Sequence, residues 1–130
     1  MTLRGVRGAT VCSKDDREAI LTATRELLRE VMRANPSLSV PDISSAVFTT
    51  TPDLSAAFPA QAAREVGWGT VPTLCAQEIP VPEALPRCIR LLIHWNTPLS
   101  QDDVRHVYLG RAGQLRPDRA WDSREGSVQT

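Results

Sequence analysis

Residues 88–97 read CIRLLIHWNT, and the run Ile89–Trp95 within this stretch predicts the central strand of the fold. A short run this rich in large apolar side chains is typical of a strand buried among neighbouring strands. Strand alternation places Arg90 on the same face as Leu92 and His94. The arginine is therefore expected either at a wet edge or partly buried against an anion.

Three elements are predicted in the first fifty residues. Residues Leu3–Val11 combine β-branched side chains with two glycines, as in a strand whose backbone is closely approached by another element. Asp15 and Asp16 offer N-caps for an amphipathic helix, in which apolar residues recur at helical spacing up to Asn35. The β-branched and small residues of Ile43–Thr50 then predict a second strand.

The remainder of the chain predicts one more helix and two more strands. Residues 56–65 are rich in alanine and favour a short helix, and residues 71–77 favour a strand. A capped turn of helix is expected at residues 100–103, before a last short strand at residues 104–109.

This order of elements predicts an α/β fold (an α+β mixed sheet), namely a five-stranded mixed β-sheet with two helices on one face. We expect residues 1–118 to form a single domain and residues 119–130, which are mostly polar, to form a flexible C-terminal tail. Two helices leave the other face of the sheet uncovered. An oligomer that closes sheets against one another is therefore expected.

The overall composition is that of a soluble globular protein. The 130 residues are 42% hydrophobic and 23% charged, and fifteen basic residues balance fifteen acidic ones. A net charge of zero predicts no nucleic-acid partner and no attraction to an anionic membrane. No apolar run approaches a membrane span, and the N-terminus lacks the apolar stretch of a signal peptide, so we expect a cytoplasmic protein. Fourteen of the basic residues are arginines, which supply planar forks for carboxylates.

The cysteines and histidines predict neither disulfides nor a metal site. Cys12, Cys75 and Cys88 are odd in number, and their spacing matches neither a disulfide framework nor a zinc site. His94 and His106 lie twelve residues apart without a nearby cysteine. We interpret Cys75 as packing rather than as a nucleophile, because nothing in its local sequence would activate a thiol.

Four residues are candidates for ligand binding or catalysis: Arg7, Glu78, Arg90 and Tyr108. Each arginine lies inside a predicted strand and needs a partner, although an ordinary surface arginine or one paired with a carboxylate would fit the pattern too. Glu78 follows an apolar strand, where it could hold a hydroxyl group, balance Arg90 or simply be solvated. Tyr108 could donate to an anionic ligand, or could keep its hydroxyl group in water.

Several separated segments combine into a larger pattern. They are LRGVRGAT (3–10), TPDLSAAFPAQAARE (51–65), GWGTVPTLCAQE (67–78), CIRLLIHWNT (88–97) and VRHVYLGRAGQLRPD (104–118). In order and spacing they resemble the trimeric chorismate mutase family over nearly the whole chain. The resemblance implies a trimer that forms a pseudo-α/β barrel, with one active site at each of the three subunit interfaces. It implies the rearrangement of chorismate to prephenate in aromatic amino-acid biosynthesis, without a cofactor.

The resemblance also implies roles for individual residues. Arg7 and Tyr108 would bind a substrate carboxylate, Arg90 would meet the ether oxygen and Glu78 the ring hydroxyl, which makes Arg90, Glu78 and Arg7 the expected catalytic set. The remaining substrate-binding residues would be Thr73, Leu74, Cys75, Ala76 and Gln77, Phe58, Ala60, Gln61 and Arg64 from the neighbouring subunit, and Leu115 and Arg116 closing the pocket. The sequence departs from the family at two of these positions: Gln61 stands where lysine is frequent, and Leu74 replaces an expected polar residue.

Two other function classes fit parts of the pattern. A trimeric metabolite-binding protein without catalysis could also place arginines at subunit clefts. A carboxylate such as Glu78 beside Arg90 would weaken simple capture of a dianion, however, and suits a site that orients a hydroxyl group. A trimeric enamine or imine hydrolase would need a group that activates water, and the sequence offers no convincing base.

Overall fold

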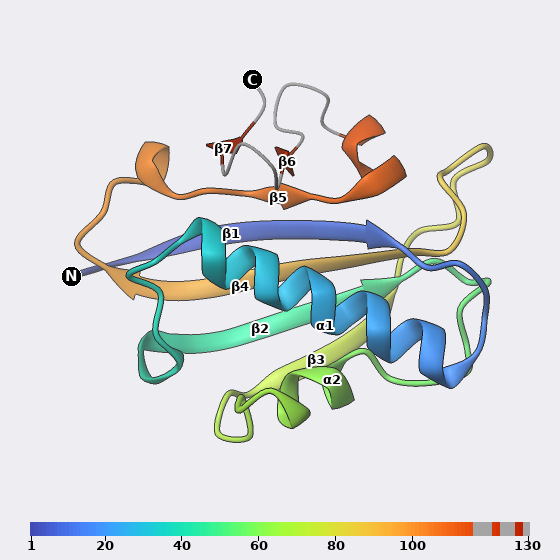
Figure 1. Ribbon diagram of the computed structural model, residues 1–130, viewed down its shortest axis with the longest axis horizontal. Helices are drawn as coiled ribbons and strands as arrows, with labels where there is room; N and C mark the ends of the chain where they lie inside the picture. Colours follow the sequence, from blue (N-terminus) through green and yellow to red (C-terminus); the bar gives the residue numbers. More distant parts are fainter. Residues whose placement is uncertain (116–120, 123–126, 129–130) are drawn as a thin grey trace.

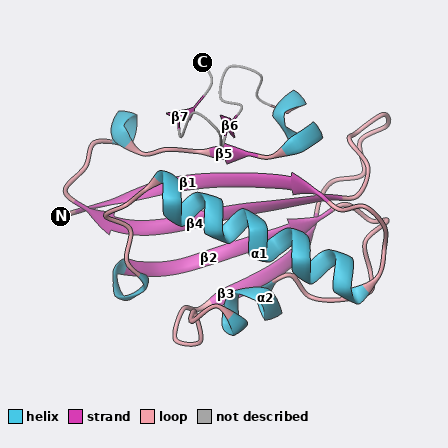
Figure 2. Ribbon diagram, viewed as in Figure 1, coloured by secondary structure: helices cyan, strands magenta, loops and turns pink. Residues whose placement is uncertain are grey.

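The structure is a computed structural model that describes residues 1–115, 121–122 and 127–128. Its elements form one large sheet with two helices on one side, as Figures 1 and 2 show, and a separate two-stranded sheet. In chain order they are β1 (Thr2–Val11), α1 (Arg17–Ala34), the 3₁₀ turn η1 (Val40–Asp42), β2 (Ile43–Thr50), α2 (Ala60–Glu65), β3 (Thr73–Gln77), β4 (Cys88–Thr97), η2 (Gln101–Asp103), β5 (Val107–Tyr108), η3 (Gly110–Gln114), β6 (Trp121–Asp122) and β7 (Ser127–Val128).

The main sheet has five strands in the order β3-β2-β4-β1-β5. β4 is central and runs antiparallel to both β1 and β2, whereas β3 is parallel to β2 and β5 is parallel to β1. The predicted five-stranded mixed sheet with two helices is therefore confirmed, and the stretch CIRLLIHWNT forms its middle strand.

The core lies between the sheet and helix α1. Alternate residues of β4 are buried on this side, including Ile89, Leu91, Ile93 and Trp95. Their partners in the core include Val6, Phe48, Leu27 and Val31. The intervening residues of β4 point to the opposite face, which we call the open face because no described helix covers it. The expectation that β4 would be buried is thus correct for one side of the strand only.

At each end of helix α1, a polar side chain forms hydrogen bonds with backbone groups. Asp16 is the N-cap, and its carboxylate accepts a hydrogen bond of 2.7 Å from the N–H of Ala19, which lowers the pKa of Asp16. Asp15, the other expected cap, instead accepts hydrogen bonds from the N–H groups of Ser55 and Ala56 and so ties a distant loop to the start of the helix.

At the other end of α1, the buried side chain of Asn35 joins the helix to the segment before β5. Its amide nitrogen donates to the carbonyl groups of Val31 and Arg105, and its amide oxygen accepts from the N–H of Arg105. The helix end is thereby fixed against the far edge of the sheet, because buried polar groups are stable only when they are paired.

Two predicted elements are shorter in the structure. The helix expected over residues 56–65 begins only at Ala60, because Pro59 disfavours helical geometry at Phe58. The strand expected at residues 104–109 is reduced to Val107–Tyr108, and the chain then turns into η3 through Gly110, whose φ is +55°.

The expected tail of residues 119–130 is described only at β6 and β7, which pair antiparallel. The rest of that prediction lies outside the described residues. None of the helices in the described part of the chain is long and apolar enough to cross a membrane.

Replacing Gly8 by alanine is expected to destabilise the protein by about 1 to 3 kcal/mol, because α1 packs directly on this residue. A Cβ atom at Gly8 would lie 3.2 Å from Leu27 and 3.3 Å from Val31, both of which are fully buried and have little room to move. Chemical denaturation of the two proteins measures the difference.

Gly5→Ala is the matched control on the same strand. A Cβ atom there would meet Leu92 at 3.6 Å, which is ordinary van der Waals contact. We expect a change within about 0.5 kcal/mol. Equal effects of the two substitutions would contradict close packing of α1 on Gly8.

Candidate active site

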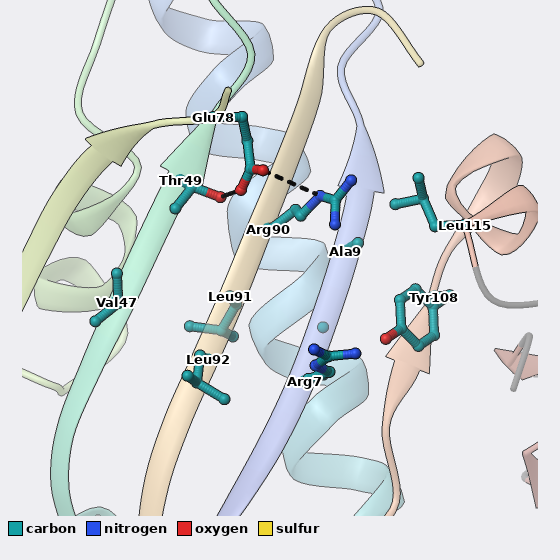
Figure 3. A pocket seen from close by; sticks show the side chains of 11 residues that line it. Arg7, Ala9, Val47, Thr49, Glu78, Arg90, Leu91, Leu92, Tyr108 and Leu115 are labelled. Carbon is teal, nitrogen blue, oxygen red and sulfur yellow. Dashed lines mark hydrogen bonds and ion pairs between the residues drawn. The ribbon is translucent and has the colours of Figure 1, made fainter. Parts of the chain in front are cut away.

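The open face of the sheet contains a concavity of about 360 Å³ (Figure 3). Its lining comes from β1, β2, β4 and β5, together with Glu78, which follows β3, and Leu115, which follows η3. The lining residues are Arg7, Gly8, Ala9, Val47, Thr49, Glu78, Arg90, Leu91, Leu92, Tyr108 and Leu115. Strand pairing assembles this site, because segments distant in the sequence become neighbours across the sheet.

Arg90, near the start of β4, lies beside Glu78, which makes contacts through both carboxylate oxygens and through its backbone N–H. The Nε atom of Arg90 lies 3.9 Å from Oε1 of Glu78. The other carboxylate oxygen of Glu78 accepts a hydrogen bond from the hydroxyl group of Thr49. The backbone N–H of Glu78 donates to the carbonyl group of Thr50 at 2.8 Å, which extends the β2–β3 ladder beyond the end of β3.

Arg7 and Tyr108 occupy the other side of the concavity. Arg7 is exposed on β1 opposite Leu92, and its backbone N–H donates to Nδ1 of His106 at 2.9 Å. Tyr108 is 5% exposed and pairs with Ala9 in the β1–β5 ladder. Figure 3 shows its hydroxyl group on the side of the ring that faces Arg7.

The charges of the site favour an anionic ligand. Of the described residues that line the concavity, Arg7 and Arg90 are positive and Glu78 is negative, which gives a formal excess of one positive charge. The guanidinium groups project from neighbouring strands, so a ligand between them would meet two planar donors. The side chain of Arg90 is 47% exposed and therefore accessible.

The expected residues of strand β3 divide between the two faces of the sheet. Leu74 pairs with Val47 and lies on the open face, 70% exposed, outside the concavity. Cys75 pairs with the buried Phe48 and packs against the core, and Thr73 follows the same alternation. Cys75, Ala76 and Gln77 line a second cavity of about 470 Å³, which also includes Phe58, Gln61 and Arg17.

The residues expected to come from a neighbouring subunit lie at the β3 edge of the sheet, remote in strand order from Arg7 and Tyr108. Phe58 is 69% exposed and Arg64 is exposed, whereas Ala60 is buried in the core of its own chain. The amide oxygen of Gln61 accepts a hydrogen bond of 2.9 Å from Arg17. Leu115 lines the concavity, and Arg116 lies outside the described residues.

The thiol groups lie outside the concavity. Cys12 and Cys88 are buried and Cys75 is half-buried, and all three are free. Burial raises the pKa of the Cys88 thiol, although the nearby Arg90 guanidinium opposes this in part, so Cys88 stays protonated at neutral pH. The part of the chain that the structure describes has no group of three or more histidine, cysteine, aspartate or glutamate residues that could hold a metal ion.

Sequence reasoning did not assign four side chains on this face to the site: Ala9, Val47, Thr49 and Leu92. Thr49 is the most informative of them, because it pairs with Arg90 in the β2–β4 ladder and contacts Glu78. Its position could have been inferred only from the register between two strands that lie about forty residues apart in the sequence.

Comparison with known proteins identifies relatives of this chain and of its fold. The family model for chorismate mutase type I matches residues 3–119. The chain is 53% identical to chorismate mutase AroH of Thermus thermophilus over 116 residues, which cover 89% of this chain and 95% of the relative. It is 43% identical to chorismate mutase AroH of Bacillus subtilis over 119 residues, covering 91% and 93% of the two chains.

A solved structure gives the same result. The fold matches a chorismate mutase from Clostridium thermocellum with a TM-score of 0.83 and 44% sequence identity, covering 85% of this chain and 98% of the other. The family resemblance noted in the sequence is thereby confirmed, and so is the fold class. The chain belongs to the chorismate mutase type I family.

Proposed function

We propose that this chain catalyses the intramolecular rearrangement of chorismate to prephenate. The observation that carries the proposal is the convergence of Arg7 and Arg90 on one concavity, with Glu78 fixed beside Arg90. The names of the relatives agree with this activity. A site with two planar cations and one oriented carboxylate suits a substrate with two carboxylates and a hydroxyl group.

In the proposed mechanism each residue meets one part of the substrate. Arg7 and Tyr108 bind a carboxylate, and Glu78 accepts a hydrogen bond from the ring hydroxyl group. Arg90 donates to the ether oxygen. Holding the enolpyruvyl arm over the ring brings the two reacting carbons together and so removes much of the entropic barrier.

The chemical step needs neither a base nor a nucleophile. The carbon–oxygen bond of the ether breaks while a carbon–carbon bond forms, and no proton is transferred. Negative charge develops on the ether oxygen as that bond stretches. A guanidinium group already held in place by Glu78 stabilises this charge more in the transition state than in the ground state.

We propose further that the enzyme acts as a cytoplasmic homotrimer, a pseudo-α/β barrel, in phenylalanine and tyrosine biosynthesis. Two features support a partner subunit on the open face: the exposed apolar side chains of Leu3, Leu74 and Leu92, and the absence of a described helix over that face. In the assembly, Phe58, Gln61 and Arg64 of a neighbouring subunit complete each site.

The activity is tested by following the absorbance of chorismate after purified protein is added without any cofactor. We expect saturable loss of chorismate and formation of an equal amount of prephenate, identified by its acid-catalysed conversion to phenylpyruvate. Tight binding of chorismate without conversion would instead favour the non-catalytic metabolite-binding protein.

A further inference from the structure

We infer that Thr49 is a positioning residue of this site, which acts on Arg90 through Glu78. Its hydroxyl group donates to one carboxylate oxygen of Glu78 and leaves the other for Nε of Arg90 (Figure 3). Arg90 also lines the concavity, where its guanidinium group can meet a ligand. The inference rests on the proposed function, because its consequence is measured as turnover of chorismate.

The register of three strands gives Thr49 this contact. Thr49 pairs with Arg90 across the β2–β4 ladder and with Ala76 across the β2–β3 ladder, so its side chain shares the open face with Arg90. Glu78 is the second residue after Ala76 and continues along the same edge. Thr49 therefore lies between the strand that presents the cation and the strand end that presents the carboxylate.

The backbone and the hydroxyl group together restrict Glu78. The N–H of Glu78 donates to the carbonyl oxygen of Thr50 at 2.8 Å, which fixes the main chain. Without a further contact, the three side-chain torsions of a glutamate would still allow its carboxylate to leave Arg90. The hydroxyl group of Thr49 is the described contact that holds the second oxygen.

The ion pair would be a weak restraint by itself. Its Nε to Oε1 distance is 3.9 Å, and the two side chains are 47% and 26% exposed, so solvent screens their attraction. A hydrogen bond from a hydroxyl group to a carboxylate is short and directional, which an exposed ion pair is not. Orientation of Glu78, and through it of Arg90, therefore depends on Thr49.

A structural role for Thr49 makes a different prediction. Threonine is a good strand former because of its β-branch, and β2 would keep this property with valine and lose it with serine. The hydroxyl group changes in the opposite way, because serine retains it and valine lacks it. The two roles can therefore be separated with two variants of one position.

The experiment compares Thr49→Val and Thr49→Ser in kcat, KM and melting temperature. We expect Thr49→Val to keep its stability but to lose about tenfold in kcat with a smaller change in KM, because a hydrogen bond to a charged group is lost. Thr49→Ser should melt at a lower temperature and yet keep kcat within about threefold of the parent. If kcat follows stability in both variants, the positioning role is wrong.

Thr50→Val is the matched control, because it removes a hydroxyl group from the next residue of the same strand, whose side chain faces away from the concavity. Its backbone carbonyl still accepts the bond from Glu78. We expect kcat of this variant to remain within about twofold of the parent. A tenfold loss here would assign the effect to β2 as a whole and overturn the inference.

A double substitution tests whether Thr49 acts through Glu78. In a Glu78→Ala background, Thr49→Val should lower kcat no further, because the carboxylate that the hydroxyl group orients is gone. If the effects of the two substitutions on kcat multiply, Thr49 acts independently of Glu78.

Should Thr49→Val fail to fold, Thr49→Ala replaces it in the same comparison. A parent protein that does not convert chorismate would contradict the proposed function, whereas an active parent with an equally active Thr49→Val would contradict only this inference.

Discussion

Arg90→Ala is expected to lower kcat by at least two to three orders of magnitude while the protein remains folded. Removing a preorganised donor to a developing negative charge costs about 3 to 4 kcal/mol in transition-state stabilisation. The structure gives Arg90 the required setting, because Glu78 lies 3.9 Å from its Nε atom and the head group lines the concavity. Steady-state kinetics with chorismate measures the effect.

Arg90→Lys should recover only part of the lost turnover. An ammonium group is a point charge and cannot bind Glu78 and the ligand through separate edges, as a planar guanidinium group can. Nearly full recovery with lysine would mean that any positive charge suffices. Circular dichroism must show that each variant is folded.

Arg7→Ala provides the comparison for substrate binding. In the proposed mechanism Arg7 binds a part of the substrate whose charge does not change, so its loss should raise KM more than it lowers kcat. If a folded Arg90→Ala variant keeps kcat within threefold and only KM rises, Arg90 has no specific role in the transition state.

The fold was predictable from local patterns where one signal dominated. The apolar periodicity of α1 and the β-branched run of β2 are local properties, and the observed strand Ile43–Thr50 has the predicted bounds. The start of α2 was not predicted, because alanine content favours a helix from residue 56 while Pro59 prevents one before Ala60. At residues 56–59 the alanine content favours a helix and the steric effect of Pro59 opposes one, and the observed helix starts where the steric effect ends.

Residue patterns alone pointed to the charged members of the candidate site and to Tyr108, and the family resemblance added Leu115. Arg7 and Arg90 attract attention because an arginine inside a strand is unusual, whatever the strand pairs with. That these two residues face one concavity depends on the pairing of β1 with β4, which no local pattern encodes. Thr49 has no such distinguishing charge. The role that we infer for Thr49 rests on its contact with Glu78.

The strand β3 illustrates the same limit. The resemblance implies that backbone and side chains from Leu74 to Glu78 line the substrate pocket, and in this strand successive side chains point to opposite faces. Cys75 accordingly packs towards the core, while Leu74 lies on the open face. Within a single chain, Glu78 is the member of this segment that reaches the concavity beside Arg90.

Separating the subunits is expected to abolish activity. Phe58 and Arg64 lie near α2 at the β3 edge of the sheet, whereas Arg7 and Tyr108 lie on the last two strands in the order β3-β2-β4-β1-β5. Phe58 and Arg64 do not line the concavity of their own chain, so the proposed site takes these two residues from a neighbouring subunit.

Leu74→Asp is designed to dissociate the trimer. Leu74 is 70% exposed on the open face, so its replacement should leave the folded chain intact and place an unpaired charge in the proposed interface. Sedimentation should show a monomer, and chorismate turnover should fall below detection. A monomer that retains activity at the assay concentration would contradict the shared site. Thr22→Asp, on the outer face of α1, is the control and should remain trimeric and active.

Mixing two inactive variants gives the most direct test of a shared site. Arg90→Ala lacks one of the two cations of the concavity, and Arg64→Ala lacks a residue that we assign to the neighbouring subunit. In a trimer assembled at random from the two variants, a site needs Arg90 in its concavity and Arg64 from the adjacent chain. It is therefore complete only when an Arg64→Ala chain forms the concavity and an Arg90→Ala chain is the neighbour that contributes Arg64. At equal concentrations, about one site in four meets this condition, so about a quarter of the parent activity should return after the subunits are exchanged. If both functions belong to one chain, no mixed site contains both arginines and activity stays at the level of the separate variants. If Arg64→Ala alone is as active as the parent, the assignment of Arg64 to the site is wrong.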